Sequence, residues 1–83
     1  MAGYHSAEIA KGVLGELSKI KEELAEVEDA LFLNNKVMVL LELSDLVGAI
    51  SFFLEKNHPS IRVEDLIVMA EATKGAFSSG HRK

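Results

Sequence analysis

Two carboxylates stand in the most apolar part of the sequence. Glu42 and Asp45 lie within residues 37–54, where most other side chains are hydrophobic. Burying an unpaired carboxylate is costly, so such groups are usually neutralised, paired or bound to a metal. On a helix the two residues would lie about 60° apart and could point at the same space. A cation site is one interpretation of this pair, and an ion pair with Lys or Arg across an interface is the other.

A second acidic pair, Glu23 and Glu26, precedes the first. Residues three apart are neighbours on a helix surface, so these carboxylates can converge. In an antiparallel hairpin turning at Asn34-Asn35, this pair lies about 8 to 12 residues before the turn, and Glu42 and Asp45 lie about 7 to 10 after it. The two pairs would then sit side by side. Glu22 is expected almost opposite the apolar stripe of its helix, facing solvent.

Four carboxylates at one place repel each other unless cations are present. Oxygen-only ligation suits a hard ion such as Mg²⁺ or Mn²⁺ rather than Zn²⁺. The chain has no cysteine, which excludes disulfides and thiolate metal sites. Magnesium that is held by few carboxylates and keeps bound water typically acts on substrate phosphates.

Three helices must position these groups, so the expected fold is all-α: a long antiparallel hairpin plus a third helix. The first helix is expected to begin after Ser6, a good N-cap, and to end at Asn34-Asn35. The second runs from about Lys36 to Asn57, where His58-Pro59 stops it, and the third from about Val63 to Phe77. The apolar stripe of the first helix has helical spacing: Ile9, Val13, Leu17, Ile20, Leu24, Val27 and Leu31. The second helix is apolar on nearly every side, which predicts a subunit interface.

Length and composition restrict the class of protein. The 83 residues, 48% of them hydrophobic, suffice for one domain spanning 1–83, with a core so small that a partner subunit or metal is expected. The net charge of −4 and the lack of a long basic block argue against nucleic-acid binding. The N-terminus lacks a signal-peptide pattern, and the longest apolar run, 37–41, is too short to span a bilayer. We therefore expect a soluble cytoplasmic protein without a membrane partner.

The acidic residues also form a motif. Glu22-Glu23-Leu24-Ala25-Glu26, followed after 15 residues by Glu42-Leu43-Ser44-Asp45, resembles the EExxE…ExxD signature of the all-α NTP pyrophosphatases, the MazG-like and dimeric dUTPase-like enzymes. The end of the chain, residues 72–82, is similar to that of short, phage-type MazG-like proteins. The resemblance covers roughly residues 15–82.

The resemblance implies a Mg²⁺-dependent nucleoside triphosphate pyrophosphohydrolase, with Mn²⁺ as a substitute, that forms a monophosphate and pyrophosphate and controls a nucleotide pool. Its metal ligands would be Glu23, Glu26, Glu42 and Asp45, with Glu26 also the candidate general base. Lys74 and Arg82 would hold the triphosphate. The enzyme would act as a homodimer or homotetramer in the cytoplasm, that of the host for a phage protein.

Three points stay open in the sequence. Some relatives carry an aromatic residue at the position of Ala49, so the small pair Gly48-Ala49 either leaves room for a purine or allows close helix packing. Lys74 could be an ordinary solvated lysine, and Arg82 part of a frayed terminus. The chain could instead be a non-enzymatic helical dimerisation module or a nucleotide-binding regulator.

Overall fold

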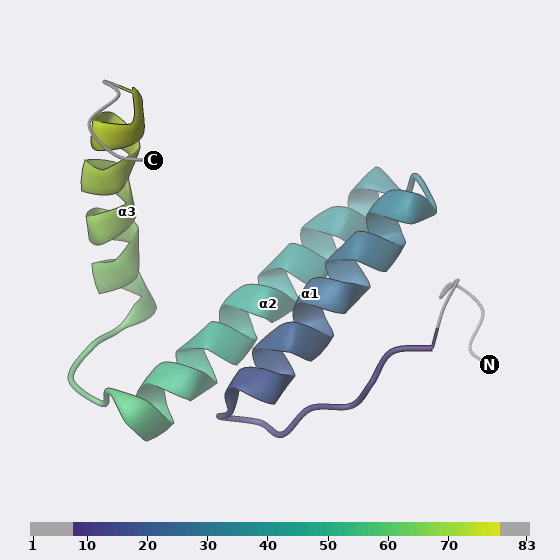
Figure 1. The fold of residues 1–83 in the computed structure, drawn as a ribbon, viewed down its shortest axis with the longest axis horizontal. Coiled ribbons are helices and arrows are strands. Elements are labelled where there is room, and N and C mark those ends of the chain that lie inside the picture. The colour runs from purple at the N-terminus through teal and green to yellow at the C-terminus, as the bar shows by residue number, and fades with distance from the viewer. Residues whose placement is uncertain (1–7, 79–83) are drawn as a thin grey trace.

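Two asparagines turn the chain back on itself and set two long helices side by side. In the computed structural model, which describes residues 8–78, α1 (Leu17–Phe32) and α2 (Lys36–Asn57) run antiparallel (Figure 1). Asn34 adopts the left-handed conformation with φ 57°, and the Asn35 side chain accepts a hydrogen bond of 3.0 Å from the Met38 N–H. The predicted hairpin and its turn at Asn34-Asn35 are confirmed: Asn34 supplies the left-handed residue and Asn35 caps the start of α2.

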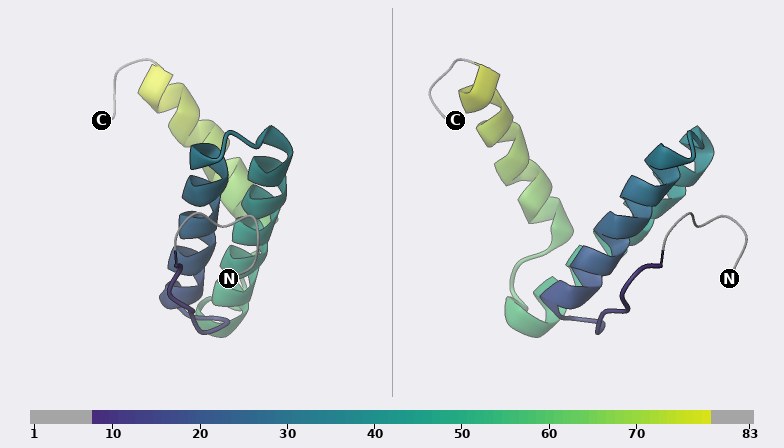
Figure 2. Two further views of the ribbon diagram at one scale, coloured as in Figure 1. Left: turned by 90° about the vertical axis from the view of Figure 1, so that its right-hand side faces the viewer. Right: turned by 45° about the vertical axis from the view of Figure 1, so that its right-hand side comes forward.

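The third helix is attached loosely to this hairpin. α2 ends at Asn57, next to His58-Pro59 as predicted, and α3 spans Val63–Ser78. The Arg62 N–H donates to the Asp65 carboxylate over 2.9 Å, which caps the start of α3. Of the other two helices, α3 contacts α2 only, and it stands away from the hairpin as an arm (Figure 2). The described residues form helices and connecting segments without strands, so the all-α class is confirmed.

The expected start of the first helix is wrong. Residues 8–16, which we call the N-terminal strap, are not helical and run back along α1 (Figure 1); Ser6 lies outside the described residues. Gly15 has φ +89°, a conformation that glycine adopts readily and that breaks a helix. Gly12 lies so close to α1 that an added Cβ would collide with the Ser18 carbonyl group. The two glycines therefore permit the course of the strap: Gly15 by its positive φ and Gly12 by its close approach to α1.

The strap is also tied to the far end of the hairpin. The Asn57 side-chain amide donates to the Gly15 carbonyl over 3.2 Å, and Lys56 pairs with Glu16 at 3.3 Å. The Val13 N–H donates to the Ser18 hydroxyl over 3.0 Å. These bonds hold the strap against both helices at the end of the hairpin opposite to the turn.

The face of α1 that packs on α2 is not the centre of the apolar stripe. Val27 and Ala30 are buried together with Glu23, while Leu17, Leu24 and Leu31 remain 55%, 48% and 61% exposed. Glu23 precedes Val27 by four residues and so lies on the same side of the helix. The helix thus turns the acidic edge of its stripe toward α2 and leaves the leucines on an open flank.

One chain buries little hydrophobic surface. Among the described residues, the buried hydrophobic side chains are Val27, Ala30, Ala49 and Leu54. Large apolar side chains are exposed on every helix, including Val37, Leu40 and Leu41 of α2 and Ile67, Val68 and Met69 of α3. The described part of one chain therefore leaves extensive apolar surface open on all three helices.

By length and composition, α2 is apolar enough to cross a membrane, which the short run 37–41 did not suggest. Core helices of soluble proteins meet the same criterion, so this property alone is weak evidence. Glu42 and Asp45 lie within α2, and carboxylates inside a bilayer are costly.

Candidate metal centre

The hairpin brings the two acidic pairs to one place. One carboxylate oxygen from each of Glu23, Glu42 and Asp45 lies within 4.8 Å of the others, across the α1–α2 interface. Glu23 and Glu42 are buried, with 7% and 5% exposure, and Asp45 is exposed. A buried pair with one open edge is a geometry that could hold a cation in contact with solvent.

Glu26 joins this group through Glu23. Oxygens of Glu22, Glu23 and Glu26 also lie within 4.8 Å of one another along α1. Glu26 is half-buried. All four carboxylates named from the sequence therefore belong to two overlapping groups that share Glu23, the member with neighbours on both helices.

Glu22 does not face solvent, and that expectation is wrong. It lies away from α2, but the strap covers it and leaves 4% of it exposed. One of its oxygens, Oε1, accepts hydrogen bonds from the Gly12 N–H at 2.9 Å and from Lys19 Nζ at 3.1 Å. The hydrogen bond from Gly12 is the largest cause that holds the pKa of Glu22 below its usual value, and the hydrogen bond from Lys19 adds to it. Burial acts in the opposite direction. Glu22 is thus an ionised anchor for the strap.

A lysine that the motif does not contain completes the cluster. Lys19 Nζ lies 3.1 Å from Glu22 Oε1 and 3.2 Å from Glu23 Oε2, with 26% of its side chain exposed. Its hydrogen bonds to Glu22 and Glu23 raise its pKa, so the ammonium stays charged. The spacings i, i+3 and i, i+4 are present in the sequence, but exposed helix pairs with these spacings are too common to single out Lys19.

The donor set fits a hard divalent ion. Every candidate ligand is a carboxylate oxygen, whereas the soft or nitrogen ligands that favour zinc are missing from both groups. Glu23, Glu42 and Asp45 would hold the ion, whereas Glu26 is grouped with Glu22 and Glu23 along α1. One exposed ligand leaves room for water and for a substrate oxygen.

The predicted phosphate-binding residues are not brought to the acidic cluster by the described residues of one chain. Lys74 is exposed on α3, and the end of α3 that carries it stands away from the hairpin (Figures 1 and 2). Arg82 lies outside the described residues. Within one chain α3 therefore does not bring Lys74 to the α1–α2 interface.

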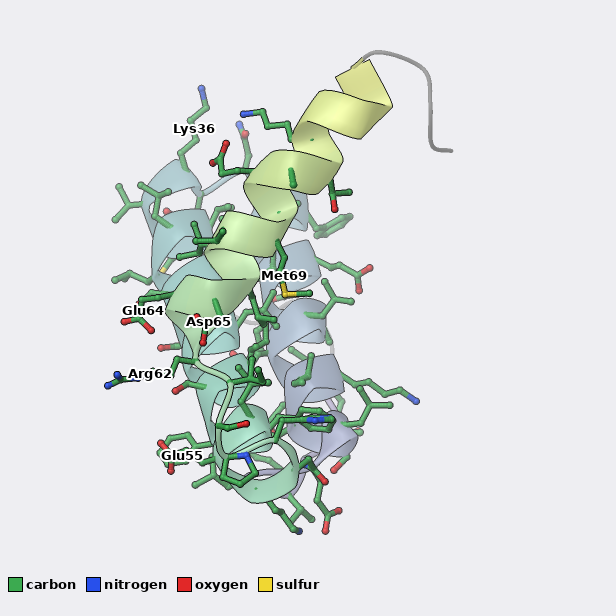
Figure 3. The ribbon with its side chains drawn as sticks, turned by 90° about the vertical axis from the view of Figure 1, so that its left-hand side faces the viewer. Lys36, Glu55, Arg62, Glu64, Asp65 and Met69 are labelled. Atoms are coloured by element: carbon green, nitrogen blue, oxygen red, sulfur yellow. The ribbon has the colours of Figure 1, made fainter. Side chains whose placement is uncertain are left out.

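The small pair on α2 has a divided role. Ala49 is 3% exposed, which agrees with close helix packing. A Cβ at Gly48 would meet nothing within 4 Å, because this residue lines a pocket of about 500 Å³ between α2, the segment 59–62 and the start of α3. The charged residues of this pocket, Arg62, Glu55 and Glu64, share one edge of the molecule (Figure 3). Two carboxylates against one guanidinium do not favour a polyphosphate there.

Comparisons of the chain with protein-family models, with curated proteins and with solved structures found no match.

Proposed function

We propose that this protein is a Mg²⁺-dependent nucleoside triphosphate pyrophosphohydrolase, which converts an NTP or dNTP and water to the monophosphate and pyrophosphate. The observation that carries the proposal is the meeting of Glu23 with Glu42 and Asp45 across two helices, within 4.8 Å. The resemblance of the motif to the all-α NTP pyrophosphatases supports the reaction type. A cytoplasmic role in controlling the nucleotide pool follows from the substrate.

The residues have distinct roles in this proposal. Glu23, Glu42 and Asp45, with Glu26, would hold Mg²⁺, which lowers the pKa of bound water and neutralises phosphate charge. Glu26 is half-buried beside Glu23 and is the candidate to accept the proton of the attacking water.

The active form in this proposal is a homodimer or homotetramer. The apolar flank of α1 and the exposed faces of α2 and α3 are not covered by the described residues, and a domain with so small a core usually gains stability from a partner subunit. A second copy is preferred to lipid because Glu42 and Asp45 would be costly in a bilayer. The α3 arm of one copy can then bring Lys74 to the site of another, where a lysine would balance triphosphate charge.

A panel of common NTPs and dNTPs, incubated with Mg²⁺ and then with Mn²⁺, tests the proposal. Resolving monophosphate, diphosphate, pyrophosphate and phosphate identifies the bond that is cleaved. Asp45→Asn should abolish turnover, and Glu55→Gln, an exposed carboxylate on the same helix, is the matched control. Full activity of Asp45→Asn would contradict the assignment of the acidic cluster as the metal site.

The competing function is a non-enzymatic helical module, which the exposed apolar faces also suit. Such a module gives no reason for acidic side chains of α1 and α2 to meet at the same level of the hairpin. Nucleotide binding without product in the same assay would instead identify a regulator.

A further inference from the structure

The acidic cluster contains its own cation. Lys19 Nζ lies 3.2 Å from Glu23 Oε2, and Glu23 is the carboxylate shared by both acidic groups. The second carboxylate partner of Lys19 is Glu22, which is 4% exposed and accepts a hydrogen bond from the Gly12 N–H of the strap. Lys19 is therefore fixed at the cluster from two sides, unlike a lysine on a free helix surface.

We propose that Lys19 is a tethered cation that competes with the divalent ion for Glu23 and so sets the metal affinity of the cluster. This inference rests on the proposed metal site. Five carboxylates lie in the two overlapping groups, Glu22, Glu23, Glu26, Glu42 and Asp45. The Lys19 ammonium contacts Glu22 and Glu23, and so reduces the repulsion around Glu23 while no metal is bound. A divalent ion that binds Glu23 must then displace Lys19 from that carboxylate.

Lys11 does not play the same part. Its Nζ lies 3.7 Å from Glu22 Oε2, and its side chain is 89% exposed, so solvent screens this contact. Glu22 is its carboxylate partner among the described residues. Lys19 is thus a positioning residue that forms an ion pair with the proposed metal ligand Glu23, whereas Lys11 contacts Glu22 at the edge of the cluster.

Lys19→Gln tests the inference, and Lys21→Gln is the matched control. Lys21 lies on the same helix, is exposed and forms no ion pair with a described residue, so the second variant loses the same charge away from the cluster. Mn²⁺ binding is measured by titration calorimetry, without nucleotide, on each variant and the wild type. Removing a positive charge in contact with a ligand should tighten Mn²⁺ binding by about tenfold, whereas a screened exposed charge should change it by less than about twofold.

The outcomes separate this inference from the proposed function. If neither the wild type nor the variants bind Mn²⁺, the metal site fails and the inference falls with it. If Lys19→Gln binds Mn²⁺ no more tightly than Lys21→Gln, the inference alone is overturned.

A second measurement on the unaltered protein decides the matter if circular dichroism shows that Lys19→Gln does not fold. Amines are acetylated briefly with and without saturating Mg²⁺, and the labelling of Lys19 relative to Lys21 is read by mass spectrometry. Loss of Glu23 to the ion should free the amine and raise the ratio. An unchanged or lower ratio overturns the inference.

Discussion

Replacing Glu42 with Gln should stabilise the metal-free protein and remove its response to Mg²⁺. Glu42 is 5% exposed, and one of its oxygens lies within 4.8 Å of an oxygen of Glu23. Two unit charges at that separation repel by about 3.5 kcal/mol at an effective dielectric constant of 20, and by about 1 kcal/mol in water. Because Lys19 already offsets part of the Glu23 charge, we expect Glu42→Gln to gain about 1–2 kcal/mol.

The assay is thermal unfolding by circular dichroism at one protein concentration, in chelator and in Mg²⁺. A gain of about 1 kcal/mol raises the melting temperature of a domain of this size by about 4–8 °C. Saturation at about 100 times the dissociation constant would stabilise the wild type by about 2.7 kcal/mol, and Glu42→Gln should gain little. The order of the two melting temperatures should therefore reverse when Mg²⁺ is added.

Glu55→Gln, on the same helix and exposed, controls for the loss of one charge and should change neither measurement appreciably. The reasoning is refuted if Glu42→Gln melts below the wild type in chelator. An equal Mg²⁺ response in both proteins would contradict the ligand assignment.

Three further outcomes follow from the structure. Because the pKa of Glu22 is lowered from its usual value of 4.5, the ionised Glu22 stabilises the fold at neutral pH. This stabilisation is lost as the pH falls from 4.5 through the lowered pKa. The urea midpoint should therefore drop less between pH 6 and pH 3 in Glu22→Gln than in the wild type. Gly12→Ala places a methyl group against the Ser18 carbonyl, so we expect a loss of about 1–3 kcal/mol in urea unfolding, and an unchanged midpoint would contradict the strap contact. Leu40, 69% exposed on α2, should lie in the proposed subunit interface, so Leu40→Glu should yield monomers by light scattering while retaining helical circular dichroism; an unaltered mass would place the interface elsewhere.

The hairpin could be predicted from the sequence because its signals are local. Asn34 and Asn35 mark a left-handed turn followed by an N-cap, and Pro59 limits the end of α2. The register of the acidic pairs follows from the turn and from equal rise in both helices. Local turn chemistry and helix geometry are therefore sufficient to bring Glu23, Glu42 and Asp45 together.

The strap could not be predicted in the same way. Its course depends on Gly12 lying against Ser18 and on the positive φ of Gly15, which are tertiary facts that helical periodicity does not contain. Since the helical pattern continues formally through Ile9 and Val13, periodicity extends α1 too far. Because the strap is not predicted, Glu22 is expected to face solvent, whereas the strap buries it.

The rotation of α1 is not specified by the sequence either, because a wide apolar stripe does not determine which of its edges packs inward. The packed edge is the one that carries Glu23, and Leu24 stays on the open flank.

The product assay with Mg²⁺ tests the central claim most directly. Wild-type protein and Glu42→Gln are incubated with each triphosphate, and monophosphate and pyrophosphate are quantified over time. We expect equal amounts of the two products from the wild type with at least one substrate, and none from Glu42→Gln. Diphosphate and phosphate as products, or equal rates from both proteins, would contradict the assignment of this acidic cluster as a pyrophosphohydrolase site.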